Sequence, residues 1–119
     1  MVNFSKIIIP EGKKKHLLNA DEIKFIKADR YYVKIFCSNK KILVRITLKG
    51  IEELLPPNFL RINKSYIVNA LFIESIEEKK STSVVVMPNE QEFQVSEKYR
   101  KSFDNYFGTN NLSKKTLSP

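Results

Sequence analysis

The stretch FLRINKSYIVN, residues 59–69, mixes apolar strand-forming residues with side chains that can bind nucleic acid. Its first half alternates apolar residues with Arg61 and Asn63, which is the period of a strand, and Lys64-Ser65 then interrupts the pattern. The break predicts a bulge or turn that presents Asn63, Lys64 and Ser65 at an edge. These residue types can read base edges and bond phosphates, so the stretch fits either a DNA contact or a solvated hairpin end.

A second group of basic residues lies on the predicted strand 31–37. Strand periodicity places Arg30, Tyr32 and Lys34 on one face, opposite a face of apolar residues. Two interpretations remain open. Either these side chains contact a ligand, or Tyr32 covers the sheet while the two cations extend into water.

Two lysines belong to a helix predicted from Glu97, for which Ser96 is the N-cap. Lys98 lies in the first turn, where the helix N-terminus favours anions such as phosphate, and Lys101 shares its polar side. A solvated helix face is the alternative. The run Lys13–Lys15 is expected in a loop, as a charged tip or a nonspecific phosphate contact.

The residues needed for catalysis or metal binding are scarce. His16 is the single histidine and Cys37 the single cysteine, so we predict no enzyme activity, no metal site and no cofactor. The acidic pairs Glu52-Glu53 and Glu77-Glu78 are interpreted as solvated surface. A lone cysteine and the absence of any long apolar run predict a cytoplasmic protein without a membrane span.

The composition favours a folded, basic domain. The 119 residues include 21 Lys and Arg against 13 Asp and Glu, which gives a net charge of +8 and a pI near 9.6. Such a charge is typical of nucleic-acid binders, although it also serves solubility. We expect one domain over residues 1–108 and a disordered tail over 109–119, because the tail has no periodicity.

The elements that must position these side chains are mostly short strands. Apolar runs and turn residues predict a β-rich domain of antiparallel hairpins. Thr47 is a candidate N-cap for a short central helix that Pro56-Pro57 ends, and Gly50 lies inside it. The expected strands are 4–10, 23–27, 31–37, 41–48, 59–63, 66–76, 84–87 and 93–95.

Several blocks, taken in order, resemble the LytTR DNA-binding domain family. The blocks are IKFIKADRYYVKIFCSNKKILVRITLKGIEELLPPNFLRINKSYIVNALFIESI and FQVSEKYRKSF, and they cover about residues 23–107. In the family, a hairpin with Y-v leads to a short L-x-x-l-e-x-x-L-P helix, then to F-x-R-i-h-r-S-y-i-v-N, and finally to v-S-x-x-y opening the last helix.

The resemblance implies a mainly β fold of antiparallel strands in stacked small sheets, with a short central helix and a C-terminal helix. It also implies a bacterial transcription regulator of the response-regulator type, whose loops enter successive major grooves of double-stranded DNA. The implied partners are DNA, a second copy on direct repeats, and a receiver domain or sensor if the chain is part of a longer regulator. The alternative is a small basic β module that binds single-stranded RNA or a protein.

Carried over residue by residue, the family's DNA contacts fall on four positions. These are Tyr32, Asn63, Lys64 and Lys98. Asn63 and Lys64 stand where the family often has histidine and arginine, and Lys98 stands where arginine is common, which changes the expected base preference.

Other positions match the motif or flank it. Arg61 and Ser65 match it as further DNA contacts or structural residues, and Tyr66 and Asn69 are expected to tie strands together. Neighbouring cations complete the expected DNA-binding set, which is Arg30, Lys34 and Lys101.

Overall fold

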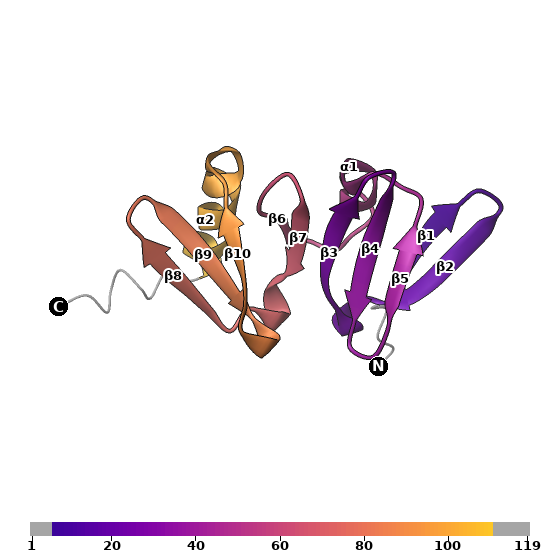
Figure 1. The fold of residues 1–119 in the computed structure, drawn as a ribbon, viewed down its shortest axis with the longest axis horizontal. Helices are drawn as coiled ribbons and strands as arrows, with labels where there is room; N and C mark the ends of the chain where they lie inside the picture. Colours follow the sequence, from indigo (N-terminus) through magenta and orange to yellow (C-terminus); the bar gives the residue numbers. More distant parts are fainter. Residues whose placement is uncertain (1–5, 111–119) are drawn as a thin grey trace.

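The computed structural model describes residues 6–110, which form three small antiparallel sheets and two α-helices (Figure 1). The strands are β1 (Lys6–Glu11), β2 (Lys14–Asn19), β3 (Ile23–Asp29), β4 (Tyr32–Cys37), β5 (Lys41–Val44), β6 (Phe59–Arg61), β7 (Tyr66–Asn69), β8 (Ser75–Lys79), β9 (Thr82–Met87) and β10 (Gln91–Val95). The helices are α1 (Leu48–Glu52) and α2 (Glu97–Asn110), with 3₁₀ turns η1 (Ala20–Glu22), η2 (Ala70–Phe72) and η3 (Pro88–Glu90).

The sheets stand side by side along the long axis of the molecule (Figure 1). A two-stranded sheet pairs β1 with β2, a five-stranded sheet has the order β5-β4-β3-β7-β6, and a three-stranded sheet has the order β10-β9-β8. Every pairing is antiparallel. The predicted mainly β fold with a central and a C-terminal helix is confirmed.

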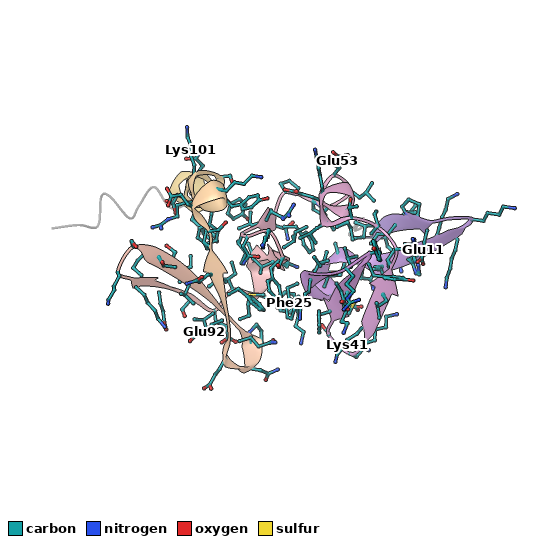
Figure 2. The ribbon with its side chains drawn as sticks, turned by 45° about the horizontal axis from the view of Figure 1, so that its top comes forward. Glu11, Phe25, Lys41, Glu53, Glu92 and Lys101 are labelled. Carbon is teal, nitrogen blue, oxygen red and sulfur yellow. The ribbon has the colours of Figure 1, made fainter. Side chains whose placement is uncertain are left out.

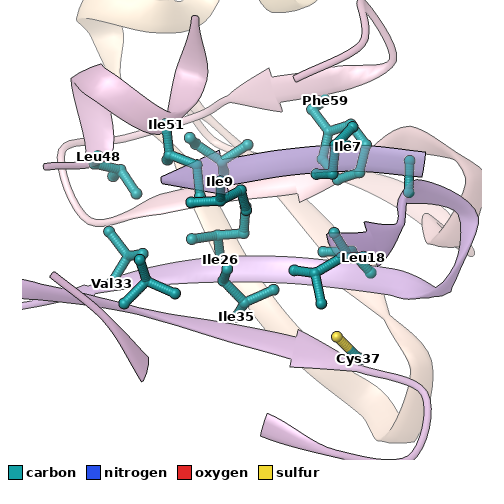
Figure 3. Packing of buried hydrophobic residues seen from close by; sticks show 14 residues of the cluster. Ile7, Ile9, Leu18, Ile26, Val33, Ile35, Cys37, Leu48, Ile51 and Phe59 are labelled. Carbon is teal, nitrogen blue, oxygen red and sulfur yellow. The ribbon is translucent and has the colours of Figure 1, made fainter. Parts of the chain in front are cut away.

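Two apolar cores lie on opposite faces of the five-stranded sheet. Adjacent residues of a strand point to opposite faces, so Ile26 enters one core while Phe25 enters the other. The first core packs the sheet against β1–β2 and α1 (Figure 3). The second packs it against the three-stranded sheet and α2, where Phe103 is buried. Burial on both faces fixes the central strands in place.

The central helix begins where the sequence predicts. The Thr47 hydroxyl oxygen accepts a hydrogen bond from the Gly50 N–H at 2.9 Å, which confirms the N-cap. A Cβ on Gly50 would lie 3.0 Å from that oxygen, so the glycine keeps the cap unobstructed. The helix ends at Glu52, before the expected proline stop.

The second helix is long. It extends through Asn110, two residues beyond the expected domain end, and the rest of the predicted tail, 111–119, lies outside the described residues. Neither α1 nor α2, the α-helices of residues 6–110, is long and apolar enough to cross a membrane.

Several strand predictions were wrong. The expected strand 41–48 ends at Val44, and Leu48 begins α1. Lys14 and Lys15 belong to β2 and not to a loop, because Gly12 adopts a left-handed φ of 61° that permits a two-residue turn into pairing with β1. The predicted strand 66–76 breaks after Asn69, where η2 intervenes before β8 joins another sheet.

Asn69 explains the break. Its side chain is fully buried, and its amide donates to the carbonyls of Ile23 at 2.8 Å and Ala20 at 3.4 Å. Its Oδ1 accepts from the Leu71 N–H at 2.9 Å and from Asn58 Nδ2 at 2.8 Å. These bonds join β7 to the turn that precedes β3, as the motif predicts.

Asn69→Ala is expected to destabilise the fold by about 3 kcal/mol or more, because it leaves several buried polar groups without partners. Asn58→Ala, which removes one of the same bonds from a partly buried site, should cost about 1 kcal/mol. Urea unfolding of both variants measures this difference. Equal, small losses would contradict the role given to Asn69.

Glu11 anchors the two-stranded sheet to the end of β5. Its Oε1 lies 2.8 Å from His16 Nε2, and its Oε2 accepts the Arg45 backbone N–H at 2.8 Å. The His16 hydrogen bond, followed by the Arg45 N–H, lowers the pKa of the Glu11 carboxyl below its usual value, and Lys14 adds to this effect.

Since the pKa of Glu11 is lowered on folding, its contribution to stability is present above the unfolded value of about 4.3 and is lost as the pH falls through the folded value. Glu11→Gln should therefore be less stable than wild type near neutral pH, and the gap should close in acid. Urea titrations at several pH values give the comparison. A gap independent of pH would contradict this account.

Candidate nucleic-acid interface

Antiparallel order sends alternate connections to opposite ends of the molecule (Figure 1). One end, which we call the basic edge, consists of turns 12–13, 30–31, 62–65 and 80–81 and of segment 96–98, where α2 begins. The charged residues of these segments are Lys13, Arg30, Lys64, Lys80, Glu97 and Lys98, and α1, which lies at the same end, adds Lys49 and Glu52 (Figure 1). The connections at the other end, 20–22, 38–40, 70–74 and 88–90, carry Asp21, Glu22, Lys40, Glu74 and Glu90. The turns therefore give the domain a charge polarity.

The β6–β7 loop, residues 62–65, is fixed from both sides. On one side the Ala28 N–H donates to the Ser65 carbonyl at 2.8 Å, next to the β3–β4 turn. On the other side the Ser96 N–H donates to the Ile62 carbonyl at 2.8 Å, at the start of α2. Three segments that are distant in sequence thus become neighbours.

Asn63 uses its side chain within this framework. Its Nδ2 donates to the Gln94 carbonyl at 2.8 Å, and its Oδ1 accepts from the Ser65 N–H at 2.8 Å. The residue is half-buried. An amide has a second N–H and a second lone pair, so capacity for a further contact remains.

Arg61 also holds this loop in place, through hydrogen bonds to its carbonyls. Its Nε donates to the Asn63 carbonyl at 2.9 Å, and its Nη2 donates to the Lys64 carbonyl at 3.0 Å. Its Nη1 lies 3.5 Å from a Glu52 carboxylate oxygen, and the guanidinium lies 5.2 Å from the Tyr99 ring centre. The Arg61 side chain is only 14% exposed, so the guanidinium mainly bonds protein atoms.

Lys64 and Lys98 are both exposed and line the same open cleft of about 430 Å³. We call it the Lys64–Lys98 cleft, and the residues that line it are Asn63, Lys64, Ser65, Tyr66, Gln94, Ser96, Lys98 and Tyr99. The Lys98 ammonium lies 5.5 Å from the Tyr99 ring centre. Two cations predicted from separate motifs therefore face one surface.

The β3–β4 hairpin presents aromatic and basic side chains beside this loop. Tyr31 is 74% exposed and Tyr32 is 37% exposed, and the Arg45 guanidinium lies 5.9 and 5.7 Å from their ring centres. Arg30 is exposed with a left-handed φ of 60°, and Lys34 is half-buried over Phe36.

Lys101, Arg45 and Tyr99 lie around these two groups of side chains. Lys101 is exposed on α2 outside the cleft lining, and Figure 2 shows it pointing away from the body of the domain. Sequence reasoning missed Arg45 and Tyr99 as parts of the site. The signal for Arg45 was a cation directly after a strand, and Tyr99 was assigned to the apolar stripe of the last helix.

Metal ligation and thiol chemistry depend on how His, Cys, Asp and Glu side chains are placed. Residues 6–110 contain no group of three or more His, Cys, Asp or Glu side chains placed to hold a metal ion. Burial raises the pKa of the Cys37 thiol, which disfavours the reactive thiolate.

A small antiparallel β domain with basic loops gathered at one end has the architecture of a nucleic-acid-binding domain. Residues 13–108 match the model of the LytTr DNA-binding domain family. The match covers well over half of the chain, and the chain belongs to this family. The predicted DNA-binding class is thereby confirmed, and the RNA or protein-binding alternative is not favoured.

Curated relatives and a solved structure are also similar to this chain. Uncharacterized HTH-type transcriptional regulators of Staphylococcus aureus strains NCTC 8325 and COL are 33% identical over 64 residues. That alignment covers 54% of this chain and 44% of each relative, so the chain spans less than half of their length. A Bacillus cereus structure, described as the LytTr DNA-binding domain of a methyl-accepting/DNA response regulator, shares the fold. It has a TM-score of 0.73 and 22% identity, over 89% of this chain and 99% of that one.

Arg61→Lys is expected to loosen the β6–β7 loop, because an ammonium cannot form the planar fork that bonds two carbonyls. Exchange of the Ala28 and Ser96 amide hydrogens, whose acceptors lie in the loop, should accelerate about tenfold. Arg100→Lys, which alters ion pairs with Glu78 and Asp104, is the matched control and should leave both amides unchanged. If the two amides exchanged at the wild-type rate in Arg61→Lys, the role given to Arg61 in holding the loop would be contradicted.

Proposed function

We propose that this chain is a transcriptional regulator domain that binds double-stranded DNA sequence-specifically through its basic edge. The observation that carries the proposal is the Lys64–Lys98 cleft, where hydrogen bonds bring two predicted contacts together. The charge polarity of the turns supports an approach to DNA with this edge first. The relatives' description as transcriptional regulators supports the regulatory part.

In this proposal, the side chains divide into direct contacts and positioning residues. Lys64 and Lys98 contact DNA directly, because both are exposed and their ammonium groups can bond phosphates or guanine edges. Arg61 acts through the loop carbonyls that it bonds. Asn63 and Ser65 shape the loop, and the second N–H of Asn63 is its remaining means of reading a base.

The hairpin and α2 complete the contact surface. Tyr32 and Arg30 approach DNA from the β3–β4 turn, with Lys34 behind them. Lys101 adds a phosphate contact along α2. The molecule measures 56 × 39 × 25 Å, and its longest dimension exceeds the 34–36 Å of one DNA turn, which supports loop insertion into successive major grooves.

The proposal extends to how the domain is used. Two copies bind at direct repeats, each copy occupying one repeat, and a receiver domain or sensor supplies the input signal. DNA bending brings both grooves to the rigid edge, so flexible pyrimidine-purine steps between the contacts contribute to specificity.

Lys64→Ala and Lys98→Ala should each weaken binding to a duplex selected from a random library by about tenfold or more, since each removes a direct contact. Each variant should also reduce the salt dependence of log K by about one if the lost contact is a phosphate. Lys40→Ala, at the opposite end of the molecule, is the matched control. Gel-shift titration at several salt concentrations provides the measurement.

The result that would refute the proposal is binding by both variants with wild-type affinity, while circular dichroism shows folded protein. Single-stranded RNA is added as a competitor in the same titration. If RNA displaced the duplex at equal concentration, the basic edge would be an RNA-binding surface, which is the alternative function.

A further inference from the structure

The β1–β2 hairpin extends the basic edge beyond the Lys64–Lys98 cleft. Its turn lies at the same end of the molecule as the other turns of that edge, and on the side remote from α2 (Figure 1). Lys13, Lys14 and Lys15 are consecutive and exposed at its tip. The left-handed Gly12 makes the turn only two residues long, so the three cations stay close together.

The hairpin is a fixed arm because its root is buried in the first core. Ile9 is fully buried there, and Ile7 and Leu18 are nearly so. The bonds of Glu11 to the Arg45 N–H and to His16 join the arm to the sheet close to its tip. Contact with a ligand would therefore not require a mobile segment to become ordered.

The two outermost turns of the basic edge, β1–β2 and β8–β9, differ in how many of their lysines are free of ion pairs. At the β8–β9 end, Lys79 lies 3.7 Å from carboxylate oxygens of both Glu77 and Glu92. Among the described residues, no hydrogen bond or ion pair occupies the side chain of Lys13 or Lys15. Lys80, in the β8–β9 turn, likewise has no such partner among residues 6–110 and is exposed, so one unpaired cation lies on that side against two at the β1–β2 tip. The positive charge available to an external anion is therefore greater on the β1–β2 side.

We infer that the β1–β2 hairpin is an auxiliary phosphate-binding arm, in which Lys13 and Lys15 contact the DNA backbone on one flank of the base pairs read by the cleft. The inference rests on the proposed function. Lysine is a flexible point charge, which suits phosphate oxygens better than paired base edges. The arm therefore adds affinity without adding sequence preference.

The test compares wild type with Lys13→Gln/Lys15→Gln and with Lys40→Gln/Lys41→Gln as the matched control. Lys41 lies at the edge opposite Lys101 (Figure 2). Fluorescence anisotropy is measured over a range of salt on the selected duplex and on duplexes trimmed at either flank. The arm variant should lower the salt slope by about two, because two phosphate contacts are lost. The control should match wild type.

Trimming of the duplex provides a second readout, which does not depend on the salt slope. Removing one flank, and not the other, should weaken wild-type binding several-fold and leave the arm variant unaffected. Base preference should be the same for all three proteins. An arm variant with wild-type slope and wild-type flank dependence would overturn the inference.

These outcomes separate the inference from the proposed function. If Lys64→Ala and Lys98→Ala bind like wild type, the proposed function fails. If those variants weaken binding but the arm variant does not, DNA binding at the Lys64–Lys98 cleft is supported and only the role given to the β1–β2 hairpin is wrong.

Discussion

The basic edge depends on the two-sided fixing of the β6–β7 loop. Its Ser65 and Ile62 carbonyls accept backbone hydrogen bonds from the β3 and α2 sides, and Arg61 bonds the two carbonyls between them. Four consecutive carbonyls are therefore occupied, and the loop has little freedom to move relative to its neighbours. Recognition of DNA requires side chains at defined spacings, and this loop sets the spacing between the hairpin and α2.

The two cores make that arrangement rigid. Because Ile26 and Phe25 enter opposite cores, the central sheet is held between β1–β2 and α1 on one face and the three-stranded sheet and α2 on the other. On the second face, Phe25 stacks on Phe36 of the neighbouring strand at 4.4 Å, and Tyr66 of β7 stacks on Phe93 of β10 at 4.2 Å, which joins the central sheet to the three-stranded sheet. Turns from all three sheets can then present their charges as one surface, since antiparallel order places alternate turns at the same end.

Local pattern was sufficient to predict much of this architecture. Strand alternation, the Thr47 cap and the apolar break at Lys64-Ser65 are properties of neighbouring residues. One error was local, because the tight turn at Gly12 places Lys14 and Lys15 in a strand. Another arose where distant contacts decide: Asn69 ends β7 through bonds to residues 46 and 49 positions away. Three side-chain arrangements likewise depend on tertiary packing, which the periodicity of a local stretch does not predict. They are the two hydrogen bonds of the Asn63 amide, the two carbonyls bonded by Arg61, and the position of Arg45 over two tyrosines.

The most direct test of the account is backbone amide NMR of the domain titrated with its selected duplex. If the basic edge contacts DNA, amide shifts should change most in residues 28–34, 62–66 and 94–99. The turns at the opposite end, 20–22, 38–40 and 88–90, should change least. Shifts centred on those opposite turns, with the β6–β7 loop unaffected, would contradict the central claim.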